Sequence, residues 1–523
     1  MLRSVLTVGG WTMASRILGF TRDILIAARL GAGPVADAFF VALKLPNLFR
    51  RLFGEGAFNS AFVPAFAGAL VKEGREAARD LAERMGALLA LWLGILTVLG
   101  LVFMPQLLAV LAPGFRASPE KFALAVELTR ITFGYLPLIC LTALVSGVLN
   151  SLDRFAAAAA APVFFNLFLM AALIGLSPHV ATAGHALAWG VLASGVVQLV
   201  MVWLAARQAG MALNLLRPPG LTPPVAAVLR RMAPGILGAG VTQVNLAVDV
   251  IIASLLPTGA VSFLYYADRV AQLPLGVVGA ALGTALLPLL ARQLRAGRRL
   301  SAHRSLNRGV ELALLLALPC AAGLAAAAGP IVSALFQRGA FGEAAAAASA
   351  AALVAYAFGL PAFVLVKVFA PGFFARGDTA TPVKLGLAAV ALNLALNLAL
   401  MGPLGHVGIA LSTSLAAWAN AGLLAWTLAR RRCFVADRRA RRVLPRLLLA
   451  SLLMGAVVAL CGALAPAPGA AAGRALLLAA LIGAGAVSYL ALGLALRAFD
   501  PREVLRLLRR RQAVAAVGTV GAA

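Results

Sequence analysis

Long apolar stretches separated by short polar segments run the length of this chain. Glycine, proline and charge clusters punctuate them, and most stretches reach the 18 or more residues typical of a membrane-spanning helix. The pattern predicts fourteen spans, near residues 5–29, 35–70, 85–111, 122–149, 156–176, 182–206, 232–256, 262–291, 309–335, 346–371, 383–401, 406–429, 447–465 and 475–496. We therefore expect an all-α polytopic membrane protein with 14 transmembrane helices.

The composition agrees with this prediction. The chain has 523 residues, of which 62% are hydrophobic and 12% charged, and its mean hydropathy is +0.96. Four cysteines lie far apart without the spacing of a metal site or a disulfide framework, so we expect them to be packing residues. Arg16 interrupts the first apolar stretch, so we expect this span to be retained and not cleaved as a signal peptide.

The net charge of +27 is distributed unevenly over the loops. One alternating set of loops, together with both termini, holds thirty-two of the lysines and arginines, and the opposite set holds four. The positive-inside rule therefore predicts that both termini are cytoplasmic. It also accounts for the charge without a nucleic-acid partner. We expect no nucleic acid, and membrane lipids as the neighbours of these loops.

Prolines inside the spans indicate an internal repeat. The prolines that recur 224 to 228 residues apart are Pro46 with Pro274, Pro64 with Pro288, and Pro137 with Pro361. Six spans per repeat is an even number, so the two repeats are parallel, an arrangement found in transporters. We expect an N-lobe over 1–207, a C-lobe over 208–442, and two extra helices with a basic tail over 443–523.

Charged residues inside the spans cluster near the N-terminus. Nine basic residues fall inside spans, six of them in the first two spans. An arginine at a helix centre costs roughly 2.5–3.5 kcal/mol in lipid, so surplus arginines such as Arg16 and Arg22 indicate a cavity for an anion. A pyrophosphate suits several guanidinium groups. The competing interpretation is a set of ion pairs that join helices, namely Arg22–Asp23 and Asp268–Arg269.

A second polar cluster falls in later spans. Asp249 is a lone carboxylate in the seventh span, Asn393 and Asn397 share one helix face, and Thr413 lies in a polar "STS" segment. Such oxygens suit a small cation, Na⁺ for preference. Two alternatives stay open, which are hydrogen bonds that join helices and a proton carried by Asp249.

Five motifs carry a family resemblance. They are "SRILGFTRD", "GAGPVADAFFVALKLPNLFRRLFGEGAFNSAFVP", "YYADR", "LGTALLP" and "KVFAPGFFARGDTATPVK". On these motifs and on its layout the chain resembles, over essentially its whole length, the MurJ (MviN) lipid II flippases of the MOP exporter superfamily. The resemblance implies a bacterial inner-membrane protein that moves undecaprenyl-pyrophosphate-linked disaccharide-pentapeptide outward for cell wall synthesis. It also implies alternating access, with a groove for the lipid tail in the last two helices.

The resemblance also implies roles for single residues. The residues implied to bind substrate are Arg16, Arg22, Arg50 and Arg269, with Ser15, Asp23, Asp37 and Asp268 beside them. Some relatives have a sodium site at positions that match the second polar cluster, which favours Na⁺ there. Coupling to H⁺ or to the membrane potential stays open, and no other cofactor is expected. Lipid II is the expected partner, and the cell-wall synthesis machinery is a further candidate.

One position departs from the family pattern. Gln272 stands where some members carry an acid three residues after the "ADR" arginine. A carboxylate at that position is therefore not essential in this chain.

Two other functions are considered. A multidrug or polysaccharide-lipid exporter of the same superfamily would share the two-lobe layout but carry fewer cations in its first span. An enzyme, such as a lipid-linked glycosyltransferase, would need a metal-binding or nucleophile motif, and the sequence has no DxD, nucleophile elbow, GxxxxGK or HExxH. We therefore expect a transporter and no enzymatic activity.

Overall fold

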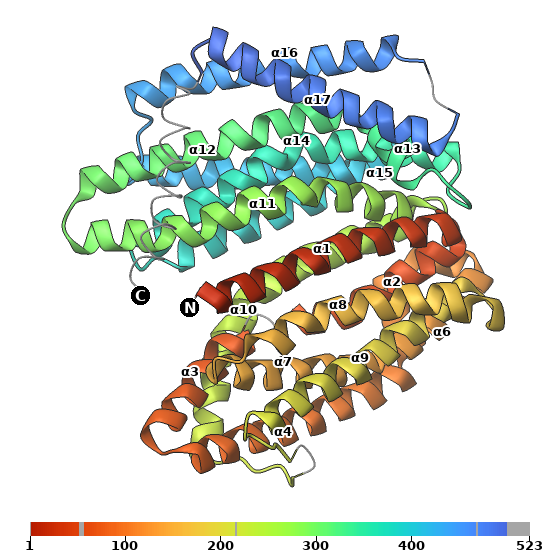
Figure 1. Cartoon of the computed structure of the whole chain (residues 1–523), viewed down its shortest axis with the longest axis vertical. Coiled ribbons are helices and arrows are strands. Elements are labelled where there is room, and N and C mark those ends of the chain that lie inside the picture. Colours follow the sequence, from red (N-terminus) through yellow and green to blue (C-terminus); the bar gives the residue numbers. More distant parts are fainter. Residues whose placement is uncertain (1, 52–56, 215–216, 467–468, 499–523) are drawn as a thin grey trace. The chain divides into compact units, whose positions relative to one another are not determined.

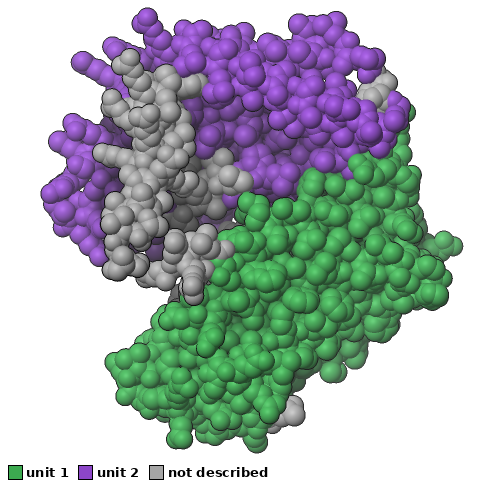
Figure 2. All heavy atoms as spheres, in the orientation of Figure 1, with its two compact units in different colours: residues 1–266, 336–346, 394–409 green, residues 267–335, 347–393, 410–523 purple. Residues whose placement is uncertain are grey.

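The computed structural model of this chain describes residues 2–51, 57–214, 217–466 and 469–498. Every regular element in these ranges is a helix, and nine helices there are long and apolar enough to cross a membrane (Figure 1). The predicted all-α membrane fold is therefore confirmed. The chain divides into two compact units (Figure 2): unit 1 is Met1–Tyr266, Phe336–Ala346 and Leu394–Ile409, and unit 2 is Ala267–Leu335, Ala347–Asn393 and Ala410–Ala523.

Unit 1 contains the first ten α-helices. They are α1 (Leu2–Leu30), α2 (Pro34–Phe49), α3 (Ala57–Lys72), α4 (Arg75–Val102), α5 (Met104–Leu111), α6 (Pro119–Phe133), α7 (Tyr135–Ser151), α8 (Phe155–Ala171), α9 (Ala183–Gln208) and α10 (Pro223–Ser254), with the short turns η2 (Pro113–Ala117), η3 (Ala172–Leu176) and η4 (Ser177–His179). Helix α1 packs along α8, α2 along α6, and α7 and α8 along α9, whereas α10 packs on α3. The predicted lobe boundaries stay predictions, because contacts and sequence repeats divide a chain by different criteria.

Unit 2 contains most of the remaining helices. They are α11 (Ala260–Arg295), α12 (Arg299–Ala326), α13 (Ala328–Phe336), α14 (Glu343–Phe374), α15 (Ala380–Arg430), α16 (Arg438–Leu464) and α17 (Ala471–Ala495), and parts of α11, α13, α14 and α15 belong to unit 1. Leucine, valine, alanine and phenylalanine side chains of α11, α12, α14 and α15 form its core. Helix α16 packs on α12, and α17 packs on α16 (blue in Figure 1). The predicted basic tail beyond residue 498 lies outside the described residues.

Local sequence explains where the helices break. Pro105 has no amide hydrogen to donate, and α4 ends three residues before it while α5 begins at Met104. In α15, Gly405 follows Pro403 and has φ 56° and ψ −133°, so the backbone leaves the helical conformation there. This break lies at the boundary that the sequence predicts between residues 401 and 406.

Two glycines let one backbone lie against another at the end of α1. Gly31 has φ 63° and Gly339 has φ 59°, in the left-handed region that favours glycine. A Cβ on Gly31 would lie 2.4 Å from the carbonyl oxygen of Ala340, and one on Gly339 would lie 2.2 Å from that of Ala28. The Ala340 amide donates a hydrogen bond to the Ala28 carbonyl at 2.8 Å. The close approach therefore requires glycine at both positions.

Candidate substrate and cation sites

Arg22 lies in α1 and is buried, with 8% of its surface exposed. Its Nε and Nη2 donate to Oδ1 of Asp23 at 3.1 and 2.7 Å, and its Nη1 donates to Oδ1 of Asn166 on α8 at 2.9 Å. The hydroxyl of Tyr265 on α11 donates to the same Asp23 oxygen at 3.1 Å. The Arg22–Asp23 ion pair considered from the sequence is therefore present in α1, and its hydrogen-bond partners come from two other helices, α8 and α11.

Asn166 fixes the position of this arginine. Its Nδ2 donates to the carbonyl oxygens of Ser15 and Pro162, at 3.1 and 3.0 Å, so the amide joins α1 to α8. Because both ends of the amide are hydrogen-bonded, the guanidinium of Arg22 is held in one place. Asn166 was not among the predicted site residues, although it is the single polar residue of the apolar segment "APVFFNLFLMA".

The other two predicted substrate arginines of unit 1 have different surroundings. Arg16 is exposed and has neither a hydrogen bond nor an ion pair within the described part of the chain. Arg50 follows α2, is partly buried, and donates from Nε to Oδ1 of Asn47 at 3.3 Å. Of Arg16 and Arg22, Arg16 is the one whose guanidinium has no acceptor among the described residues.

Asp37 lies in the first turn of α2 and is 1% exposed. Its Oδ2 accepts from Nζ of Lys121 at 2.7 Å and from the Gly259 amide at 2.8 Å, and its Oδ1 accepts from the amide and the hydroxyl of Ser262 at 3.0 and 2.6 Å. The carboxylate therefore caps the beginning of α11 and neutralises a buried lysine. The place of Asp37 beside the substrate arginines stays a prediction; the groups bound to its carboxylate, which we call the Asp37 cluster, are Lys121, Gly259 and Ser262.

Lys121 on α6 is the residue of this cluster that the sequence analysis missed. Its side chain is 7% exposed, and its ammonium lies 4.1 Å from the centre of the Phe115 ring. The sequence gives no signal for this burial, because Lys121 lies just before a predicted span among ordinary loop charges.

The predicted substrate-site residues of unit 2 lie in α11. Asp268 and Arg269 are both partly buried. The side-chain amide of Gln272 donates to Oδ2 of Asp268. The residue that replaces the family's acid therefore supplies a donor to the neighbouring carboxylate.

The candidate cation residues fall in both units. Asn397 is fully buried, and its Nδ2 donates to Oδ1 of Asp249 at 3.0 Å within unit 1. No donor among the described residues reaches Oδ1 of Asn397. Asn393, which is 1% exposed, and the partly buried Thr413 belong to unit 2. A buried carbonyl oxygen without a donor is costly, and a small cation would satisfy it.

The chemistry of these residues fits an alkali cation. The described residues contain no group of three His, Cys, Asp or Glu side chains that could hold a metal ion. Within unit 1, Asp249 and Asn397 offer one carboxylate and one amide oxygen, which are ligands that hard cations prefer.

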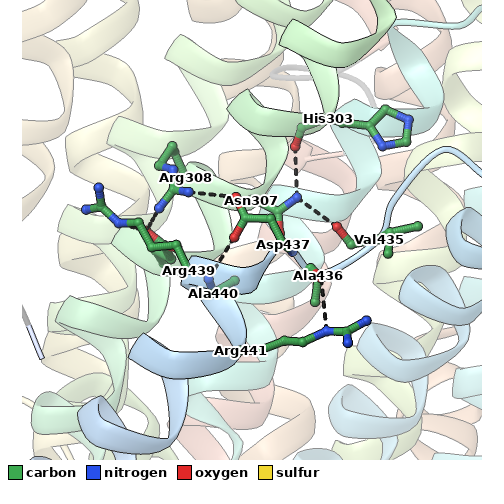
Figure 3. Close-up of polar contacts among 10 residues, drawn as sticks. His303, Asn307, Arg308, Val435, Ala436, Asp437, Arg439, Ala440 and Arg441 are labelled. Atoms are coloured by element: carbon green, nitrogen blue, oxygen red, sulfur yellow. Dashed lines mark hydrogen bonds and ion pairs between the residues drawn. The ribbon is translucent and has the colours of Figure 1, made fainter.

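The segment between α15 and α16 binds to the beginning of α12 (Figure 3). Asn307, which is 2% exposed, donates from Nδ2 to the Val435 carbonyl at 3.0 Å and accepts from the Asp437 amide at 3.2 Å. Asp437 caps α16 by accepting from the Ala440 amide at 2.7 Å, and its other oxygen accepts from Arg308 at 2.6 Å. We call Asn307, Arg308 and Asp437 the linker clasp. It fastens α16 to α12.

Relatives with assigned names cover almost the whole chain. The family model described as lipid II flippase MurJ matches residues 26–477. The probable lipid II flippase MurJ of Rhizobium meliloti (strain 1021) is 43% identical over 99% of this chain and 98% of its own length. The lipid II flippase MurJ of Burkholderia cenocepacia is 35% identical over 88% of this chain and 90% of its own length.

Solved structures with the same fold include transporters of more than one family. A lipid II flippase MurJ in an inward closed conformation matches with a TM-score of 0.79 at 24% identity, over 94% of this chain and 98% of that one. An inward-facing multidrug resistance MATE family transporter of the MOP superfamily matches with a TM-score of 0.69 at 14% identity, over 82% and 98%. The fold is thus shared with a multidrug resistance transporter, whereas the family model and the relatives matched by sequence are all lipid II flippases. By its family model and these relatives, this chain belongs to the MurJ lipid II flippase family.

Proposed function

We propose that this chain moves lipid II from the cytoplasmic to the periplasmic leaflet of the inner membrane by alternating access. The 43% identity with a named flippase over 99% of the chain carries this proposal. The arginines of α1 give it a chemical basis, because the cargo bears a pyrophosphate. The family model and the relatives are named flippases, so the protein is a transporter and not an enzyme.

The proposed membrane layout has fourteen spans, arranged as two parallel six-helix repeats and two further helices. Each predicted span contains a described helix, and α15 supplies two of them on either side of Gly405. Both termini lie in the cytoplasm in this layout, because the basic loops follow the positive-inside rule.

The headgroup site in this proposal combines Arg16, Arg22 and Arg50 with Arg269 of the second repeat. Arg16 has no protein acceptor in the described chain, which leaves its guanidinium available to a phosphate. Arg22 is held by Asp23 and Asn166, so it contributes positive charge from a fixed position. Hydrogen bonds to a charged group contribute about 1.5–3 kcal/mol each, so a few such contacts suffice for recognition.

Asp37 has a different part in this proposal. Its oxygens accept hydrogen bonds from Lys121 and from the beginning of α11, which supports a role in holding α2, α6 and α11 together and not in contacting the headgroup. These contacts must break before the three helices can separate at that end.

The lipid tail is proposed to lie against α16 and α17. Between Leu447 and Leu496 the only charged residue is Arg474. The side chains of Leu452, Leu460 and Ile482 are 58–63% exposed, as expected for helices that face hydrocarbon. A photoreactive polyprenyl analogue should label these two helices, and labels confined to α1–α15 would contradict the groove.

Coupling to Na⁺ through Asp249 and Asn397 is the proposed driving step. Asp249→Ala should then weaken transport and remove its dependence on Na⁺. A transport rate that follows pH and ignores Na⁺ would favour a proton carried by Asp249. Unchanged activity would leave Asp249 with a hydrogen-bonding role only.

The test of the whole proposal is outward flipping of lipid II in cells depleted of this protein and complemented with variants. The wild-type chain and Arg29→Ala should restore flipping, since Arg29 is an exposed arginine of the same helix outside the proposed site. Arg16→Ala should fail at normal protein level. Efflux of cationic dyes without flipping would instead support the multidrug exporter.

A further inference from the structure

Lys367 is a charged residue in the apolar helix α14 to which the proposed function gives no part. It lies seven residues before the end of the helix and is exposed. Among the residues that the structure describes, no acid and no hydrogen-bond acceptor contacts its ammonium. A lysine in a membrane-spanning helix without a partner either reaches to lipid headgroups or faces a polar cavity.

The neighbouring helix has a gap that fits this lysine. Gly279 of α11 is buried, and a Cβ on it would lie 2.7 Å from both Cδ and Nζ of Lys367. The end of the lysine side chain therefore lies over the backbone of α11, and with a larger residue at position 279 the lysine would have to leave this position. A lysine that extended freely to the headgroups would not need such a gap.

The exposed apolar side chains in the first part of α14 lie on a different side of the helix from Lys367. Val354 and Phe358 are 43% and 51% exposed. At 100° per residue they lie roughly 140–180° around the helix from Lys367. In the first part of α14 the exposed apolar side chains therefore lie away from the side that bears the ammonium, and Phe374, at the C-terminal end of the helix, is the exposed apolar residue on the lysine side.

We propose that Lys367, seated on Gly279, is an oxyanion contact of unit 2 for the phosphate-bearing headgroup. Gly279 lies ten residues after Arg269, which is about 15 Å along α11 toward its C-terminal end. In the proposed layout this end is cytoplasmic, so an entering headgroup meets Lys367 before Arg269. This inference rests on the proposed function, because it assigns a further contact for the same cargo.

The test measures binding of lipid II and of undecaprenyl pyrophosphate to the purified full chain in nanodiscs. Lys367→Met keeps the length of the side chain and removes its charge, and it should weaken binding about tenfold, the value of one charge-assisted contact. Lys367→Arg should retain most of the affinity. Lys384→Met, at the exposed beginning of α15, is the matched control and should bind like wild type.

A second variant separates the contact from a structural effect. Gly279→Ala should weaken binding in the wild-type background and have no further effect when Lys367 is already Met. Equal loss for both ligands assigns the contact to the pyrophosphate, and loss for lipid II alone assigns it to the carboxylates of the peptide.

Two outcomes overturn the inference and can be told apart. If Lys367→Met binds with wild-type affinity while Arg269→Ala loses affinity, the proposed function stands but Lys367 does not contact the cargo. Lys367 then extends to the headgroups of the membrane lipids. If the wild-type chain binds neither ligand, the proposed function itself fails.

Discussion

The linker clasp allows a prediction whose size follows from its geometry. Asn307→Leu keeps the approximate volume of the side chain but removes its hydrogen bonds to the Val435 carbonyl and the Asp437 amide. Each buried polar group left without a partner costs about 1–3 kcal/mol. Val435 is 55% exposed, so water can reach its carbonyl and the lower value applies. With about 1 kcal/mol for each of the two groups, the loss is about 2 kcal/mol in total. The docked segment should therefore open about 30-fold more often.

Hydrogen–deuterium exchange on the purified full chain measures this opening. The amides of residues 435–440 should exchange about 30-fold faster in Asn307→Leu, while peptides of unit 1 keep their wild-type rates. Asn150→Leu is the control, since Asn150 is exposed at the end of α7. Wild-type exchange of the segment in Asn307→Leu would refute the reasoning, because the clasp would then contribute nothing to docking.

Three further predictions concern single contacts. Asp37→Ala should lower the melting temperature because it leaves Lys121 buried without an acid. The double variant Asp37→Ala with Lys121→Ala should lose less, and equal melting temperatures of the single and the double variant would contradict the ion pair. Asn166→Ala should destabilise the chain by about 1.5–3 kcal/mol in thermal unfolding, since Nη1 of Arg22 loses its acceptor. Burial and the charge of Arg376 lower the pKa of His303 below 6.5 in the folded chain. The unfolded chain therefore takes up the proton at a higher pH than the folded chain, and the free energy of unfolding should fall as the pH drops below 6.5. His303→Gln should flatten this part of the melting-temperature profile, and an unchanged profile would exclude His303 as its source.

Hydropathy is a local property, which is why the sequence predicts the helices well. The predicted first span, 5–29, corresponds to α1 (Leu2–Leu30), and the break near Gly405 was predicted within a few residues. The predicted span 35–70 contains two helices, α2 and α3, because hydropathy does not distinguish one long helix from two consecutive ones.

Partners distant in the sequence could not be predicted in the same way. The residues bound to Asp37 include Ser262, which is 225 positions away, and Arg22 binds Asn166, which is 144 positions away. The sequence analysis identified both charged residues correctly as unusual, but the number of available donors and acceptors around each depends on how the helices pack. For Asp37 that packing supplies enough donors to occupy both carboxylate oxygens.

The paired glycines at the end of α1 bear on which sequence changes this region can accept. The hydrogen bond between Ala340 and Ala28 uses main-chain atoms only, so the identities of these two alanines matter little to it. Gly31 and Gly339, in contrast, cannot be replaced by a residue with a side chain unless the backbone segment opposite moves away. Cysteine scanning through this turn would therefore report a damaged structure at the two glycines, and a loss of function there would say nothing about access of the reagent. Neutral variation should accumulate at the alanines and be absent from the glycines.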